Sequence, residues 1–261
     1  MKTVFLFDLD GTLCASRKQV TKKIIKLLSK ANKSIEIGIL TGSDMDFLKE
    51  QCEELFLAMP HDFKVYALAC NGTKAYNVIK SDEKISYEVI KEEDLRAHLG
   101  EVAFRKLMTE LVYAQAEIMQ DADDIPLTGT FITYRGSTVN WCPIGRMATD
   151  ADRDKFKEID AERGLRGIRA GELQEFLDEN GIKLTAVIAG DTSFDIYPEN
   201  WDKTYAMQFF NEYDVYYWGD RMTPEGNDYT MHKLLEDKSF PVTGPKDTCT
   251  SVKKKMKDLG I

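Results

Sequence analysis

Two aspartates separated by one residue follow the first apolar segment of the chain, in Phe7-Asp8-Leu9-Asp10-Gly11-Thr12. Because residues i and i+2 of an extended chain point the same way, we expect Asp8 and Asp10 to face one crevice. Neighbouring carboxylates repel each other, and oxygen ligands suit Mg²⁺, so the pair predicts a magnesium site. Gly11 allows a sharp turn, and Thr12 offers a hydroxyl and a backbone N–H to a phosphate.

The elements that would position this motif are predicted from the apolar pattern. Residues 4–7 form an apolar run ending in acids, as a buried parallel strand does, which argues against a plain capping turn. Further elements are expected in alternation: a helix over 20–31, a strand over 35–40, a helix from Asp44 to about Leu55 and a strand over 65–70. This rhythm predicts a right-handed, Rossmann-like parallel α/β sheet that binds ligands at the carboxyl ends of its strands.

The pattern changes after about residue 83. Helices are then expected over 92–119, 150–163 and 171–179, and strands over 130–134, 138–142, 184–189 and 193–197. From Trp201 the α/β pattern returns, with a helix, a strand over 215–218 and a terminal helix from about Lys246. We therefore expect a discontinuous core domain of residues 1–83 and 199–261, with an inserted α+β cap domain over 84–198.

Composition excludes several classes of protein. The 261 residues include 44 acidic and 35 basic side chains, a net charge of −9, which argues against binding nucleic acid. No apolar stretch approaches the roughly 20 residues of a membrane span, and the N-terminus lacks a signal-peptide pattern. The five cysteines include no C-x-x-C pair, so we expect reduced thiols in a cytoplasmic protein without a membrane partner.

Further polar residues follow the apolar strands in order. Ser43 lies in Thr41-Gly42-Ser43-Asp44, at the start of a helix, and Lys203 and Asp220 flank the late strand. Asn227 and Asp228 come shortly after it. Taken singly, Ser43 is more often a helix cap, Lys203 a solvated lysine and Asp220 an ordinary strand-end acid. Their joint order and spacing favour a common site over coincidence.

Together these motifs resemble the haloacid-dehalogenase phosphotransferases. The resemblance implies that Asp8 attacks phosphorus and forms an aspartyl-phosphate, while Asp10 acts as general acid and base. It also implies that Ser43 and Lys203 bind the phosphoryl group. Asp8, the backbone carbonyl of Asp10 and Asp220 would hold Mg²⁺, with Asn227 and Asp228 as support.

The middle of the chain is similar to the cap of eukaryotic-type phosphomannomutases. The blocks that carry the similarity are 5–17, 129–153, 193–203 and 215–228. The resemblance implies a substrate-binding set of Arg17, Arg135, Arg146, Arg153, Ser193 and Asp195. The arginines would hold the phosphate that is not reacting, since a guanidinium binds phosphate through paired hydrogen bonds. Arg153, between Asp152 and Asp154, is equally explained as a surface salt bridge.

The resemblance implies an isomerase that interconverts mannose 1-phosphate and mannose 6-phosphate and feeds GDP-mannose synthesis. Mg²⁺ would be the cofactor, and a hexose 1,6-bisphosphate the activator and intermediate. The main alternative is a sugar-phosphate phosphatase that uses the same Asp8 with water as acceptor. A non-catalytic paralogue is a weaker alternative, because every expected catalytic residue is present. Mannose and glucose differ by one hydroxyl orientation, so the preference between them stays open.

The resemblance also implies a homodimer formed through the cap. Leu99, Phe104, Leu107 and Leu111, at helical spacing, would supply an apolar face for it, or would pack inside the cap. Relatives tend to bind a second cation through backbone carbonyls around residues 232–237. Leu234 replaces an acid there, which weakens the case for that second site.

Overall fold

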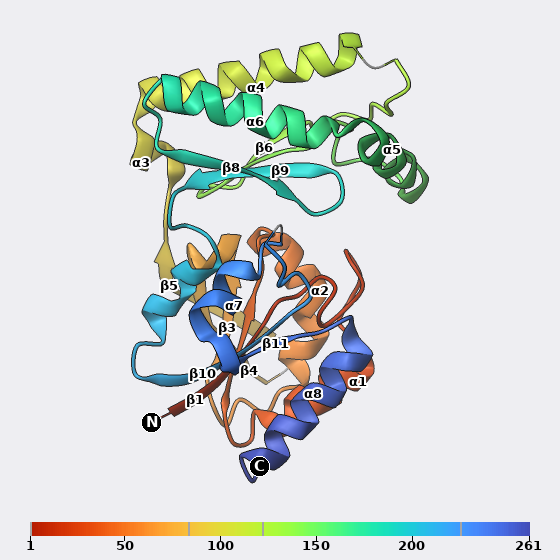
Figure 1. Cartoon of the computed structure of the whole chain (residues 1–261). Helices are drawn as coiled ribbons and strands as arrows, with labels where there is room; N and C mark the ends of the chain where they lie inside the picture. The colour runs from red at the N-terminus through yellow and green to blue at the C-terminus, as the bar shows by residue number, and fades with distance from the viewer. Residues whose placement is uncertain (1, 83, 122, 225) are drawn as a thin grey trace. The chain divides into compact units, whose positions relative to one another are not determined.

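The computed structural model describes residues 2–82, 84–121, 123–224 and 226–261 and divides the chain into two compact units (Figure 1). The core unit comprises Met1–Glu92 and Asn200–Ile261, and the cap unit comprises Glu93–Glu199. The second unit therefore begins at Glu93 rather than at residue 84. The reason is that the segment from 84 to 92 is a strand of the core sheet.

The core unit is built on a seven-stranded sheet in the order β11-β10-β1-β2-β3-β4-β5. Its strands are β1 (Lys2–Phe7), β2 (Glu36–Leu40), β3 (Val65–Ala69), β4 (Lys74–Ser81), β5 (Lys84–Glu92), β10 (Tyr213–Gly219) and β11 (Ser239–Pro241). The first five strands in that order pair in parallel, and this pairing was expected for β1, β2, β3 and β10. The β4–β5 hairpin and β11 were not expected, and the hairpin closes one edge in antiparallel fashion.

Helices cover both faces of this sheet. They are α1 (Lys22–Ala31), α2 (Met45–Ala58), α7 (Tyr229–Leu235) and α8 (Pro245–Asp258), with the 3₁₀ turns η1 (Cys70–Gly72), η2 (Lys203–Phe209) and η3 (Glu236–Lys238). Successive side chains of β1 point to opposite faces: Phe5 and Phe7 pack with α1, α2 and α8, whereas Val4 and Leu6 pack with η2 and α7. Both faces of β1 are thus buried, which explains its continuous apolar sequence.

The cap unit is an α+β layer pair, as expected. Its antiparallel sheet has the order β6-β7-β9-β8, from β6 (Ile132–Tyr134), β7 (Val139–Trp141), β8 (Leu184–Ala189) and β9 (Ser193–Pro198). Its helices are α3 (Leu95–Leu99), α4 (Glu101–Asp121), α5 (Asp150–Arg163) and α6 (Leu165–Glu179). The helix expected over 92–119 is interrupted at Gly100, whose φ of +77° ends α3 before α4 begins.

One face of α4 packs inside the cap unit. Leu107 and Leu111 have no exposed surface, and Leu99 and Phe104 pack against the same core. The four residues considered for a dimer face therefore pack within their own unit. The apolar residues that α4 exposes are others, among them Val102 and Tyr113, which are 75% and 64% exposed. No helix in the described part of the chain combines the length and apolar character that crossing a bilayer requires.

Candidate active site

Three carboxylates meet at the carboxyl ends of the parallel core strands. Asp8 follows β1 and Asp220 follows β10, and these strands are neighbours with Phe7 paired to Trp218. Parallel neighbours end at the same edge of a sheet, so the two side chains are brought together. The loop after β10 adds Asp228, and oxygen atoms of the three carboxylates lie within 4.8 Å of one another. The site therefore draws its acids from two separate parts of the sequence.

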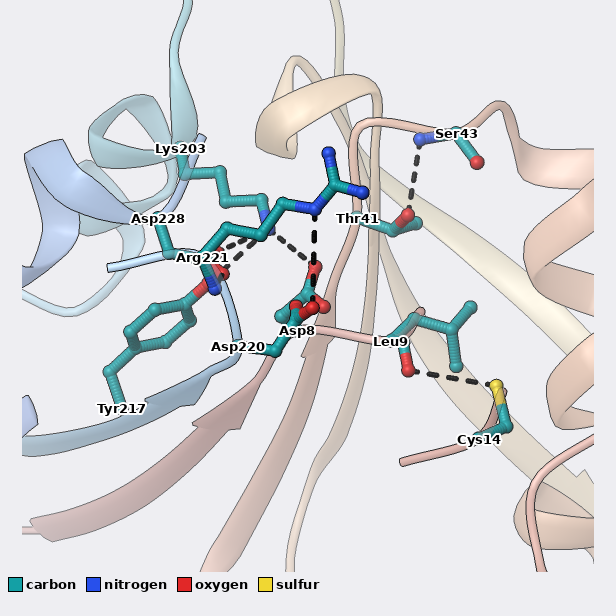
Figure 2. A network of polar contacts seen from close by, with 10 residues as sticks. All are labelled: Asp8, Leu9, Cys14, Thr41, Ser43, Lys203, Tyr217, Asp220, Arg221 and Asp228. Atoms are coloured by element: carbon teal, nitrogen blue, oxygen red, sulfur yellow. Dashed lines mark hydrogen bonds and ion pairs between the residues drawn. The ribbon is translucent and has the colours of Figure 1, made fainter. Parts of the chain in front are cut away.

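A buried lysine ties two of these acids together. Lys203, 1% exposed, donates hydrogen bonds to Asp8 and, over 2.6 Å, to Asp228 (Figure 2). The hydroxyl of Tyr217 also donates to Asp228. Lys203 was expected to neutralise Asp8, and the structure adds Asp228 as its second partner. The ammonium of Lys203 and the guanidinium of Arg221, whose Nε lies 4.0 Å from Oδ2 of Asp220, thus face three carboxylates, so the acids outnumber these two cations.

The charges shift one another's protonation. Burial raises the pKa of Asp8 to about 8, against the opposing effect of Lys203. Burial and the nearby Asp228 raise the pKa of Asp220. Burial disfavours a charge on Asp228 too, but Lys203 and two further hydrogen bonds hold its pKa below the usual value. Burial would lower the pKa of Lys203, and the two carboxylates raise it above its ordinary range instead. These opposing shifts mark a site where negative charge is held in excess.

Glycines let these carboxylates approach the backbone. Gly11 has φ +85°, and a Cβ placed on it would lie 2.2 Å from Oδ2 of Asp220. A Cβ on Gly219 would lie 2.6 Å from the carboxylate of Asp228. Any side chain at either position would displace an acid. The all-oxygen donor set and the excess negative charge fit a divalent cation.

The Asp10 carboxylate is not one of the three clustered acids, and its hydrogen bonds hold it beside Gln51 and Arg17. Its Oδ1 accepts hydrogen bonds from Nε2 of Gln51 at 2.8 Å and from the backbone N–H of Arg17 at 2.9 Å. That Asp8 and Asp10 face one crevice stays a prediction, because β1 ends at Phe7 and both aspartates lie beyond the extended strand. Gln51 was not singled out in the sequence, because a glutamine inside a helix gives no local signal.

The loop after β2 contributes Ser43 beside the cluster. Figure 2 shows Thr41 and Ser43 at the end of the strand that neighbours β1. The backbone N–H of Ser43 donates to Thr41 Oγ1 at 3.1 Å. The cap of α2 is Asp44, which accepts from the N–H of Phe47, so Ser43 is not the capping residue.

The remaining expected core residues differ in burial. Asn227 is exposed and Asp228 is fully buried. The exposed Arg17 places its guanidinium 6.0 Å from the ring centre of Phe47, and its own φ is +60°. The buried Thr12 hydroxyl has no hydrogen-bond partner among the described residues.

Polar residues of the cap sheet form a second network. Arg135 is buried, and its Nη1 lies 3.3 Å from Oδ1 of Asp195. Asn140, opposite Asp195 in the β7–β9 pair, donates to the same oxygen at 2.8 Å and accepts from Nη1 of Arg146 at 3.3 Å. The structure therefore brings Arg135, Arg146 and Asp195 together. Asn140, which joins them, lay inside the recognised block but was not assigned a role.

Arg153 and Ser193 lie beside this network. Nη1 of Arg153 donates to Thr192 Oγ1 at 2.8 Å, and Nη2 donates to the carbonyl of Arg146 at 3.4 Å. Its acidic neighbours have other partners, since Asp154 pairs with Lys157 and Asp152 forms the capping box of α5 with Thr149. Ser193 is buried and donates to the carbonyl of Ala189 at 3.1 Å.

The fold of the chain is haloacid-dehalogenase-like. A haloacid dehalogenase-like hydrolase from Bacteroides thetaiotaomicron superposes with a TM-score of 0.57 at 15% identity, covering 98% of this chain and all of that one. A truncated IMP-nucleotidase from Plasmodium falciparum gives 0.65 at 13% identity, covering 98% and 70%. At such low identity these likenesses establish the fold alone.

Sequence comparison identifies the protein family to which the chain belongs. The family model described as eukaryotic phosphomannomutase matches residues 24–258, so the chain belongs to the eukaryotic phosphomannomutase family. A phosphomannomutase of Arabidopsis thaliana is 32% identical over 252 residues, covering 96% of this chain and 95% of that protein. One of Schizosaccharomyces pombe is 33% identical over 257 residues, covering 97% and 94%.

Proposed function

We propose that this protein is a phosphomannomutase that interconverts mannose 1-phosphate and mannose 6-phosphate, and thereby supplies GDP-mannose synthesis. The family membership and the curated relatives, which bear this name and match over nearly their whole length, support the reaction class. The observation that carries the proposal is the buried Asp8–Lys203–Asp228 network at the strand ends. This network places a nucleophile, the Asp8 carboxylate, next to a positive charge, the Lys203 ammonium.

Asp8 is the nucleophile in this proposal. Its carboxylate attacks phosphorus, and the sugar oxygen leaves as the aspartyl-phosphate forms. Lys203, already in contact with Asp8, remains beside the phosphoryl oxygens and offsets their charge. Ser43 donates a hydrogen bond to the same group. Asp10 gives a proton to the leaving sugar oxygen and takes one from the attacking hydroxyl in the reverse transfer.

Mg²⁺ is the cofactor that we assign to the acidic cluster. Asp8, Asp220 and the backbone carbonyl of Asp10 would hold it, with Asp228 and Asn227 supporting the loop. Bound there, it would stabilise the negative charge of the phosphoryl group. Whether backbone carbonyls near residues 232–237 hold a second cation stays a separate prediction.

The cap arginines distinguish a mutase from a phosphatase. A mutase passes through a hexose 1,6-bisphosphate, so one phosphate must be held while the other reacts. Arg17, Arg135, Arg146 and Arg153 bind the non-reacting phosphate in this proposal, and Ser193 and Asp195 bind sugar hydroxyls. The bisphosphate then turns end for end and returns its other phosphate to Asp8. A glucose or mannose 1,6-bisphosphate would therefore act as activator.

Location and assembly complete the proposal. Five free cysteines, four of them buried, fit a reducing cytoplasm. A homodimer through the cap would use the exposed face of α4 around Val102 and Tyr113, because the face first considered is buried. Light scattering in solution measures this directly: a dimer mass is expected for the native chain and a monomer mass for Tyr113→Asp.

Conversion of mannose 1-phosphate tests the proposed reaction. The protein is incubated with mannose 1-phosphate, Mg²⁺ and a trace of glucose 1,6-bisphosphate. Mannose 6-phosphate appears if the proposal is right. Release of inorganic phosphate without mannose 6-phosphate would support the phosphatase instead. The same assay with glucose 1-phosphate decides the preference between the two sugars.

A further inference from the structure

A small cavity lies inside the cap unit, among the helices and the sheet. Its volume is about 130 Å³. Its apolar lining consists of Ile118, Ile125, Pro143, Phe156, Leu165 and Phe194. Phe194 has no exposed surface and Phe156 is 1% exposed, so the inner wall belongs to the core of the unit. The inner wall of the cavity is thus apolar and belongs to the core of the cap unit.

Three arginines complete the wall, and each already has an anionic partner. Arg163 pairs with Asp124 and Arg166 pairs with Asp160, both over 2.7 Å. Arg169 pairs with Glu117 over 2.8 Å and with Glu172 over 2.9 Å. The side chain of Arg163 is 42% exposed, against 13% and 17% for the other two, so the cavity opens beside Arg163. Four carboxylates pair with these three guanidinium groups, which disfavours an anionic ligand.

We propose that this cavity is a binding site for a neutral apolar molecule about the size of benzene. An apolar cavity gives water too few hydrogen-bond partners, and one of about 150 Å³ lined by Leu, Ile and Phe stays dry and binds benzene or xenon. The cavity here is close to that size, and six of its nine lining residues are apolar. A guanidinium group has a flat face on which an aromatic ring can stack, and three such groups line the wall.

Two side chains of the cavity wall lie close to residues of the polar network in the cap sheet, so a bound molecule can influence that network. Phe156 lies one helical turn after Arg153, and Phe194 lies between Ser193 and Asp195 with its ring on the opposite face of β9. A ligand that fills the cavity restricts the motion of Phe156 and Phe194, and through them the positions of Arg153, Ser193 and Asp195. We therefore expect occupancy to change the Michaelis constant for the sugar phosphate, a consequence that rests on the proposed mutase function.

Titration of the full-length protein with benzene, followed by amide NMR, tests the site. Saturable shifts are expected at cavity residues, with a dissociation constant on the order of 1 mM. Leu165 is a half-buried residue of the cavity wall. The larger side chain of Leu165→Phe would fill the cavity and should weaken benzene binding at least about tenfold. Leu165→Met, of similar volume, is the matched control and should leave binding within about twofold. Ile118→Phe is a second filling variant that approaches from another helix.

Several results would overturn the inference. The site is refuted if native protein shows no saturable benzene shifts, or if both filling variants bind benzene as the native chain does. Tighter binding of benzoate than of benzene would refute the neutral ligand. An unchanged Michaelis constant at benzene saturation would refute the coupling alone. If the protein makes no mannose 6-phosphate, the proposed function fails while the NMR titration still decides the site.

Discussion

At the scale of single residues, Lys203 controls the electrostatics of the core site. It is buried between Asp8 and Asp228 and contacts the hydroxyl of Tyr217 at 3.3 Å. A buried charge is tolerated only when it is paired, and removing one partner of such a group leaves the others uncompensated. The sequence marked Lys203 through its position after the cap, but the doubly paired geometry depends on a loop that the local pattern does not specify.

Lys203→Met should destabilise the protein and abolish catalysis. Loss of the ammonium leaves Asp8 and Asp228 facing each other in a buried place, at a cost of about 3 kcal/mol in the free energy of unfolding. Urea denaturation measures this cost. The control Lys233→Met removes an exposed lysine and should change the free energy of unfolding by less than about 0.5 kcal/mol. Equal midpoints for Lys203→Met and the native chain would contradict this account of the network.

Gln51 holds the side chain that we assign to proton transfer. Its Nε2 lies 2.8 Å from Asp10 Oδ1 and 3.1 Å from the carbonyl of Lys18, and only 5% of the residue is exposed. No sequence pattern predicts such a contact, because the two partners are 41 positions apart and meet only in the folded chain.

Gln51→Leu should lower kcat by about 10- to 100-fold, because Asp10 loses one of the hydrogen bonds that fix its orientation. The KM for mannose 1-phosphate should change less than threefold, since Gln51 is not assigned to substrate binding. Steady-state kinetics with mannose 1-phosphate separates the two constants. Gln208→Leu, at an exposed glutamine, is the control. A native kcat in Gln51→Leu would show that Asp10 does not depend on this contact.

At the scale of helices and strands, the buried strands of the core sheet could be predicted from the sequence, whereas an exposed hairpin could not. Strands β1, β2, β3 and β10 were anticipated because strands buried on both faces give continuous apolar runs. The β4–β5 hairpin was missed because β5 is largely exposed and rich in charge, so its sequence resembles a linker. The parallel register of β1 and β10, which joins Asp8 to Asp220, is a long-range pairing that the motifs implied only through family resemblance.

Helix α5 depends on its first turn. Thr149 and Asp152 form a capping box, and the next residue is Arg153, whose guanidinium binds Thr192. Thr149→Ala should cost about 1 kcal/mol in local stability. It should also raise the KM for mannose 1-phosphate more than it lowers kcat, because Arg153 is displaced. Amide hydrogen exchange of residues 150–154 measures the local opening.

The control for this helix is Thr250→Ala, which alters an exposed position inside α8. It should leave both hydrogen exchange in α5 and the kinetic constants unchanged. If Thr149→Ala also leaves exchange in α5 unchanged, the capping box does not stabilise this helix. If exchange rises and KM does not, the position of Arg153 does not control substrate binding.

At the scale of the whole molecule, each unit has its own core and its own polar network. The core unit gathers carboxylates around Lys203, whereas the cap unit gathers Arg135 and Arg146 around Asp195 and Asn140. In the proposed function, the core network exchanges a phosphoryl group and the cap network recognises phosphate, which suits a doubly phosphorylated sugar. Sequence motifs singled out most residues of both networks, but not Asn140, which contacts Asp195 and Arg146, nor Gln51, which contacts Asp10.

The central claim is that Asp8 carries the phosphoryl group during turnover. We would mix the protein with a hexose 1,6-bisphosphate and Mg²⁺, quench it in acid within one turnover and map the modified peptide by mass spectrometry. The account predicts one phosphoryl group on Asp8, its loss when mannose 1-phosphate is added before the quench, and no modification in Asp8→Asn. Phosphorylation at another residue, or mannose 6-phosphate formed by Asp8→Asn at the native rate, would contradict it.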